Sequence, residues 1–200
     1  MQRRKFLVGV GGTAIGGSAL LGSGAFSRVE SQRHVSIAVA EDPDAYLGIT
    51  PLNEKFSDEW TKNGNNYAHL DEKGHAYLEI TDSGNGGEGV NSDSKTWFDG
   101  LFEICNNGKA DAEFTLDWGD VDIAENAEII LYFQHTIGGP IMAELSSDDP
   151  DGAAGLKVGT CQYMGVRTET FSVNAKEEDT IADGTLKIIA DAPGAGELQP

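Results

Sequence analysis

Two stretches of alternating apolar residues constrain the fold of this chain more than any other feature of its sequence. An apolar residue at every second position is typical of a β-strand with one face buried and one face in water. These positions are Phe98, Gly100, Phe102 and Ile104 in the first stretch and Phe114, Leu116 and Trp118 in the second. The asparagine- and glycine-containing turn at 106–108 predicts that the two stretches pair as an antiparallel hairpin.

The rest of the chain carries the same kind of pattern in short segments. Residues 129–133 are apolar at every position, which predicts a central strand buried on both faces. Segments 68–70 and 75–80 flank a turn and predict a second hairpin. Phe56 and Trp60 are spaced for one helical turn, although an irregular loop fits the polar residues around them equally well. Further strands are expected at 46–49, 158–173 and 186–190, and exposed loops at 82–94 and 146–155.

Eight to ten short strands without a long helix predict an all-β fold. We expect a single antiparallel β-sandwich, immunoglobulin-like or jelly-roll-like, behind an N-terminal signal segment. The sandwich is placed at 27–192, the signal segment at 1–26, and a flexible tail at 193–200.

The chain is strongly acidic. Its 200 residues carry a net charge of −19, and three of the 14 basic residues, Arg3, Arg4 and Lys5, precede residue 27. Such a surface repels nucleic acid and anionic lipid, so neither is expected as a partner. The excess of acidic residues indicates either a protein that stays soluble at very high salt or a disordered chain. The 39% hydrophobic content and the strand pattern favour the halophilic protein.

The N-terminus has the features of an export signal. Arg3, Arg4, Phe6 and Leu7 resemble the twin-arginine motif, and no charged residue follows before Arg28. The uncharged run is long enough to cross a bilayer but is rich in glycine, which favours a cleaved signal over a retained anchor. No later stretch approaches 18 apolar residues, so no membrane span is expected in the mature chain. We therefore expect recognition by the export machinery and an extracellular or cell-surface location.

The first strand expected after the signal lies close to the new N-terminus. Val35, Ile37 and Val39 alternate with small or polar residues, so one face of this strand is apolar. A strand so close to a free end can complete the sheet of a neighbouring copy, which would give a head-to-tail polymer. It can equally pair within its own sandwich and leave the protein monomeric.

Cys105 and Cys161 are the two cysteines of the chain. An even number of cysteines in an exported protein suggests a disulfide. Two separate buried thiols fit the sequence equally well, because strand positions alone do not show whether the two Cα atoms lie close enough for a bond.

Other patterns that could carry chemistry are weak. Gly84, Gly86 and Gly89 match the spacing of a phosphate-binding loop, but no helix pattern follows and Glu88 would repel the anion. Cys161, Met164 and His135 lack the second histidine of a blue-copper site. Two acidic clusters could hold calcium but do not follow the twelve-residue calcium loop. They are Asp148, Asp149 and Asp151, and Asp82, Asn85 and Glu88. Motifs of serine hydrolases and zinc proteases are missing from the sequence, so we expect no enzyme, no cofactor and no metal.

The end of the signal and the start of the mature chain also resemble a known family. Residues 22–27 read Gly-Ser-Gly-Ala-Phe-Ser, and residues 45–49 read Ala-Tyr-Leu-Gly-Ile after the Val/Ile/Ala strand. This pattern resembles the haloarchaeal family called domain of unknown function one-one-zero-two and, more remotely, the camelysin-like matrix proteins of spore-forming bacteria. The resemblance implies an exported β-sandwich and, in the camelysin-like branch, subunits of extracellular fibres.

Two functions follow from these expectations. The favoured one is an exported structural subunit of the cell surface or extracellular matrix, with the strand at 35–39 as the contact between copies. The alternative is a secreted, soluble, non-enzymatic binding module for a small ligand or calcium.

Overall fold

The computed structural model describes residues 40–81, 89–173 and 180–191 of the chain. Residues 1–26, in which we expect the export signal, lie outside these ranges, and so do the expected strand at 35–39 and the tail at 193–200. The glycine-rich match at Gly84 and Gly86 also lies outside them.

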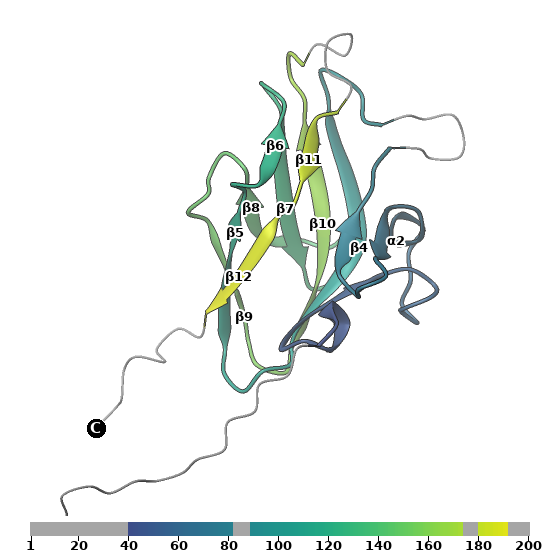
Figure 1. The fold of residues 1–200 in the computed structure, drawn as a ribbon, viewed down its shortest axis with the longest axis vertical. Helices are drawn as coiled ribbons and strands as arrows, with labels where there is room; N and C mark the ends of the chain where they lie inside the picture. Colours follow the sequence, from purple (N-terminus) through teal and green to yellow (C-terminus); the bar gives the residue numbers. More distant parts are fainter. Residues whose placement is uncertain (1–39, 82–88, 174–179, 192–200) are drawn as a thin grey trace, which may run out of the picture. The chain divides into compact units, whose positions relative to one another are not determined.

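The described chain forms two layers of antiparallel strands. The larger layer is a five-stranded sheet with the order β1-β4-β10-β7-β8. Its strands are β1 (Leu47–Pro51), β4 (Lys95–Asn106), β10 (Cys161–Glu169), β7 (Glu128–Gln134) and β8 (Ile141–Ser146). In Figure 1 the long strands β4, β10 and β7 run side by side behind the shorter strands of the second layer.

Smaller sheets cover the inner face of this large sheet. They have the orders β12-β5-β9, β11-β6 and β2-β3. Their strands are β12 (Lys187–Asp191), β5 (Ala112–Asp117), β9 (Ala153–Leu156), β11 (Ala182–Gly184), β6 (Val121–Ile123), β2 (Ala68–Leu70) and β3 (Ala76–Leu78). The 3₁₀-helix η1 (Asp42–Asp44) precedes β1, and the short helix α2 (Lys62–Tyr67) precedes β2.

The core lies between the two layers and is built from the alternating residues of the sequence. Phe98, Phe102 and Ile104 point inward from β4, and the rings of Phe114 and Phe133 meet edge to face with their centroids 5.1 Å apart. Residues 129–134 are all buried, which confirms the prediction of a central strand. The predicted all-β, antiparallel sandwich is confirmed.

The predicted hairpin between the two alternating stretches is wrong. β4 pairs with β1 and β10, whereas β5 pairs with β12 and β9 in the other layer. The buried side chain of Asn106 explains the crossing, because its Nδ2 donates to the carbonyl oxygens of Ala110 and Leu156, each at 2.9 Å. The chain therefore passes from one layer to the other after β4 instead of turning back in the same sheet.

Three further details differ from the sequence-based expectations. The expected loop at 146–155 contains the start of β9, and the short strand β11 was not expected. In the polar segment after β1, α2 begins beyond Phe56 and Trp60, with Thr61 Oγ1 accepting a hydrogen bond from Gly64 N at 2.7 Å. In the parts of the chain that the structure describes, no helix has the length and apolar character that a membrane crossing requires.

Candidate functional site

A groove of about 730 Å³ opens on the inner face of the large sheet. Its floor is formed by Ile129 of β7 and by Val166 and Thr168 of β10. One wall is formed by residues 77–81, which run through and beyond β3, and by 89–92. The other wall is formed mainly by 180–183, which includes the start of β11. The volume falls within the range of about 300–1,000 Å³ that is usual for ligand-binding pockets.

Both walls of the groove are edges of small sheets. Residues 77–81 line the groove, whereas no residue of β2, the partner of β3, does so. Residues 180–183 also line it, whereas no residue of β6, the partner of β11, does so. Each partner strand therefore lies on the side away from the groove. Among the described residues, β3 pairs with β2 alone and β11 pairs with β6 alone. The groove is therefore bordered by the unpaired edges of two strands, and such edges are templates for a further strand.

Hydrogen bonds within the hairpin show which groups of β3 face the groove. Glu79 N donates to Tyr67 O, and His75 O accepts from Asp71 N, each at 2.9 Å, so residues 75 and 79 bond toward β2. Because successive residues of a strand direct their backbone groups to opposite edges, Leu78 and Ile80 direct theirs to the free edge. These two residues thus offer two N–H and two C=O groups to an incoming strand.

The groove is lined by apolar side chains and by polar ones such as Thr81, Asn91 and Thr180, and it also contains one unsatisfied hydroxyl. Ile80, Val90 and Ile181 pack against the core and are only partly buried, so the groove leaves core residues open. Thr168 is 3% exposed, and its Oγ1 has no hydrogen-bond partner in the described part of the chain. A buried hydroxyl without a partner costs roughly 1–3 kcal/mol, and a polar group in the groove could reach the Thr168 oxygen only if that side chain turned.

Thr170 fixes one wall of the groove. Its Oγ1 donates to Asn91 O at 2.7 Å, its backbone N donates to Ser94 O at 2.9 Å, and its backbone O accepts from Asp93 N at 2.8 Å. These bonds tie the segment that leads into β4 to the end of β10. The groove is thus a built feature of the sandwich, held by contacts between segments that are far apart in sequence.

The described chain enters the sandwich close to β3. Asp42 N in η1 donates to Gly74 O at 3.0 Å, and Asp42 Oδ2 accepts from Ala76 N at 2.7 Å. The described chain therefore begins beside the strand that borders the groove.

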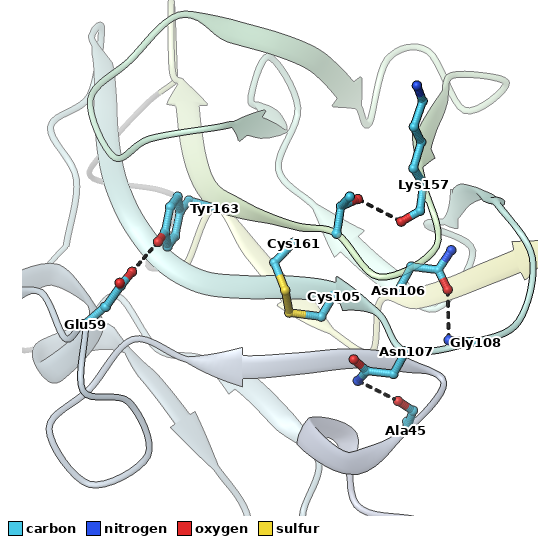
Figure 2. The surroundings of a disulfide bond; sticks show 10 residues. Ala45, Glu59, Cys105, Asn106, Asn107, Gly108, Lys157, Cys161 and Tyr163 are labelled. Carbon is cyan, nitrogen blue, oxygen red and sulfur yellow. Dashed lines mark hydrogen bonds between the residues drawn. A yellow bond between two sulfur atoms is a disulfide. The ribbon is translucent and has the colours of Figure 1, made fainter.

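The two cysteines form a disulfide on the outer face of the large sheet (Figure 2). Cys161 of β10 lies directly opposite Cys105 of β4, with Cα atoms 4.1 Å apart. Two residues farther along, Tyr163 lies opposite Glu103, and the Tyr163 hydroxyl donates to the carboxylate of Glu59 from the loop after β1. Burial, together with the nearby Glu59 carboxylate, raises the pKa of Glu103.

A second cluster on the outer face surrounds a buried tyrosine. The hydroxyl of Tyr132 donates to Asp99 Oδ1 at 2.7 Å, and the ring of Trp97 meets the Tyr132 ring with centroids 5.3 Å apart. The guanidinium of Arg167 lies 4.6 Å from the centroid of Trp97 and forms an ion pair with Glu144. Because its residues satisfy one another, this cluster stabilises the sheet, and sequence analysis missed it since its members come from four strands.

The weaker sites considered from the sequence are not assembled. Cys161 is bonded to Cys105, and Met164 is buried on the opposite face of β10, so they do not converge with the exposed His135. Asp148, Asp149 and Asp151 lie in an exposed turn after β8, where Asp149 N donates to Ser146 O. Asp82, Asn85 and Glu88 lie outside the described residues.

No protein-family model matches the chain, and no curated protein is similar enough to be counted as a relative.

Proposed function

We propose that this protein is an exported structural subunit of the cell surface or extracellular matrix. Copies are joined when the strand at 35–39 of one copy enters the groove between β3 and β11 of the next. The observation that carries this proposal is the groove itself, in which two unpaired strand edges border an open part of the core.

The strand and the groove agree in length and in pattern. Residues 35–39 and the wall at 77–81 each span five residues, about 17 Å in extended conformation. Val35, Ile37 and Val39 share one face of the strand, and that face would cover the groove's floor. Burying three such side chains stabilises the contact by roughly 5–9 kcal/mol before the cost of association is subtracted.

The polarity of this contact leads to a filament. The donor segment precedes η1 of one copy, whereas the acceptor is the groove of another, so the two surfaces are different. Contacts between different surfaces continue from copy to copy unless the rotation between copies closes a ring. Insertion of the strand into its own groove would use the same contacts and give a monomer, so the oligomeric state decides between the two arrangements.

Features of the sequence support export and adaptation to high salt concentration. The twin arginines Arg3 and Arg4 favour secretion, and the net charge of −19 favours a surface that is screened by concentrated salt. Both features suit a subunit that assembles outside the cell.

A matched pair of variants tests the proposal in the chain that begins at Ser27. Ile37→Asp places a charge on the face that would enter the groove, whereas Ala38→Asp places the same charge on the opposite face. In concentrated salt, wild type and Ala38→Asp should form filaments visible by negative-stain electron microscopy, and Ile37→Asp should sediment as a monomer. A wild-type protein that stays monomeric at every concentration, or two variants that behave alike, would contradict the proposal.

A second candidate function rests on the unsatisfied hydroxyl of Thr168. The same groove could hold a small ligand with both apolar and polar groups, one of which would bond to Thr168 Oγ1 after that side chain turns, and this would make the protein a soluble binding module. The test is binding of an environment-sensitive fluorescent fatty acid. Binding by a monomeric wild-type chain, together with weaker binding by Thr168→Val, would favour this function over the filament.

A further inference from the structure

The disulfide and an adjacent carboxylate bring three possible metal ligands together. Glu103 and Cys105 lie two positions apart on β4, so their side chains share one face of the sheet, and Cys161 lies opposite Cys105 on β10. The two sulfur atoms and one oxygen of Glu103 all lie within 4.8 Å of one another. Cys161 is exposed, whereas Cys105 and Glu103 are half-buried, so the group can be reached from solvent.

The surroundings of this group attract cations. The Glu59 carboxylate is held on the same face by the hydroxyl of Tyr163 (Figure 2). Within the described ranges, neither Glu59 nor Glu103 forms an ion pair with a basic side chain. A pair of uncompensated carboxylates in a chain of net charge −19 raises the local concentration of divalent cations.

We propose that reduction of the disulfide converts this group into a binding site for a thiophilic divalent cation such as Zn²⁺. The ligands are the thiolates of Cys105 and Cys161 and the carboxylate of Glu103, and water completes a tetrahedral set. A carboxylate beside two thiolates suits zinc better than it suits calcium, which takes oxygen ligands alone.

The chemistry of the conversion balances. A water-soluble phosphine transfers two electrons to the disulfide and takes an oxygen atom from water to become the phosphine oxide, while the two sulfur atoms become thiols. The cation then displaces one proton from each thiol as the two metal–sulfur bonds form. In both states β4 and β10 are tied at the same rung, by a covalent bond under oxidising conditions and by a metal bridge under reducing ones.

This site is independent of the groove, because it lies on the opposite face of the large sheet. Val166 and Thr168 of β10 line the groove. Because side chains alternate between the two faces along a strand, the odd-numbered Cys161 and Tyr163 lie on the opposite, outer face. The inference therefore holds whether or not the protein polymerises.

Cadmium binding to the reduced full-length chain provides the test, because cadmium–thiolate bonds give a charge-transfer band in the ultraviolet. After the phosphine is removed without oxygen, the band should saturate at one Cd²⁺ per chain and be reversed by Zn²⁺. The oxidised protein should show no band. Glu103→Gln should weaken Cd²⁺ binding by about tenfold or more, and Glu113→Gln, an exposed acid of β5, should leave it unchanged.

A second measurement covers the possibility that reduction unfolds the chain. The melting temperature of the reduced protein should rise with Zn²⁺ in wild type and in Glu113→Gln, and much less in Glu103→Gln. Binding that is equal in Glu103→Gln and Glu113→Gln, or a reduced protein that shows no band, would overturn the proposal.

Discussion

The ring of Tyr132 lies directly over Gly165, its partner on the neighbouring strand. A Cβ atom at position 165 would lie 2.3 Å from Tyr132 Cζ and 2.7 Å from the carbonyl oxygen of Phe98. The absence of a side chain lets the tyrosine cross β10 and reach Asp99 on β4, to which its hydroxyl donates. One glycine thus allows β7 and β4, which are not neighbours in the sheet, to be joined across the strand between them.

Replacing this glycine should destabilise the sandwich. Gly165→Ala forces the Tyr132 ring and the backbone near Phe98 to move, and overpacking of this kind costs about 1–3 kcal/mol. Gly155→Ala on β9 is the control, because a Cβ there meets nothing within 4 Å. Equilibrium unfolding in denaturant measures both. Equal stability of the two variants would mean that the tyrosine does not depend on the space above Gly165.

Two tyrosines should ionise late in the folded protein. Burial, followed by the hydrogen bond to Asp99, raises the pKa of Tyr132 strongly, and the hydrogen bond to Glu59, followed by burial, raises the pKa of Tyr163 to about 12. A raised pKa means that the folded state holds the proton more tightly than the unfolded state does. For Tyr163 the stabilisation is therefore complete below about pH 10 and is lost as the pH rises through about 12, and for Tyr132 it is lost at still higher pH.

Ultraviolet absorbance of the phenolate measures this titration. In the folded wild type, two of the five tyrosines should ionise at higher pH than the others. These late ionisation steps should disappear from the titration curve when Tyr132→Phe and Tyr163→Phe are introduced. The unfolded chain should titrate all five near pH 10. If all five tyrosines of the folded wild type ionise at the same pH as those of the unfolded chain, the hydrogen bonds to Asp99 and Glu59 do not form in solution.

The faces of single strands could be predicted from the sequence, whereas the pairing of strands could not. Alternation at Phe98, Phe102 and Ile104 correctly placed these residues in the core. Their partner strand is set by Asn106, whose side chain bonds to residues as distant as Leu156, and no local pattern reports such a contact. The hairpin prediction failed for this reason.

The groove also could not be predicted from local sequence patterns. Its floor and walls come from segments near residues 79, 90, 129, 168 and 181, which meet only when the layers are assembled. The alternation at 35–39 predicts a strand with one apolar face, and this segment lies outside the described residues. The groove that would accept this segment could not be predicted, because an unpaired strand edge can be recognised only when the pairing of all the strands is known.

Removing the disulfide should cost a large part of the stability. The bond joins residues separated by 56 positions, and closing a loop of that length stabilises a fold by about 4 kcal/mol in the chain-entropy model. The double variant Cys105→Ser, Cys161→Ser should show this loss in denaturant unfolding, and reduced wild type without metal should match it. A double variant as stable as the oxidised wild type would show that the unfolded chain is not restricted by the bond.

Stability should also depend on salt. Because three of the 14 basic residues and none of the 33 acidic ones precede residue 27, the remainder carries a net charge of −22. Transfer from about 1 M to about 0.1 M salt lengthens the screening distance from roughly 3 Å to 10 Å, so repulsion between acidic groups grows. Calorimetry should record a markedly lower Tm at low salt. A Tm that does not change would rule out adaptation of this surface to high salt.

Hydrogen exchange at the backbone amides of Leu78 and Ile80 tests the filament contact most directly. These two N–H groups face the groove, and strand insertion should bond them. We predict slow exchange at both amides in assembled protein, fast exchange in a chain that begins at Glu41, and slow exchange again when a peptide of residues 33–40 is added to that chain. Fast exchange in the assembled protein, or slow exchange in a wild-type monomer at low concentration, would contradict strand insertion between copies.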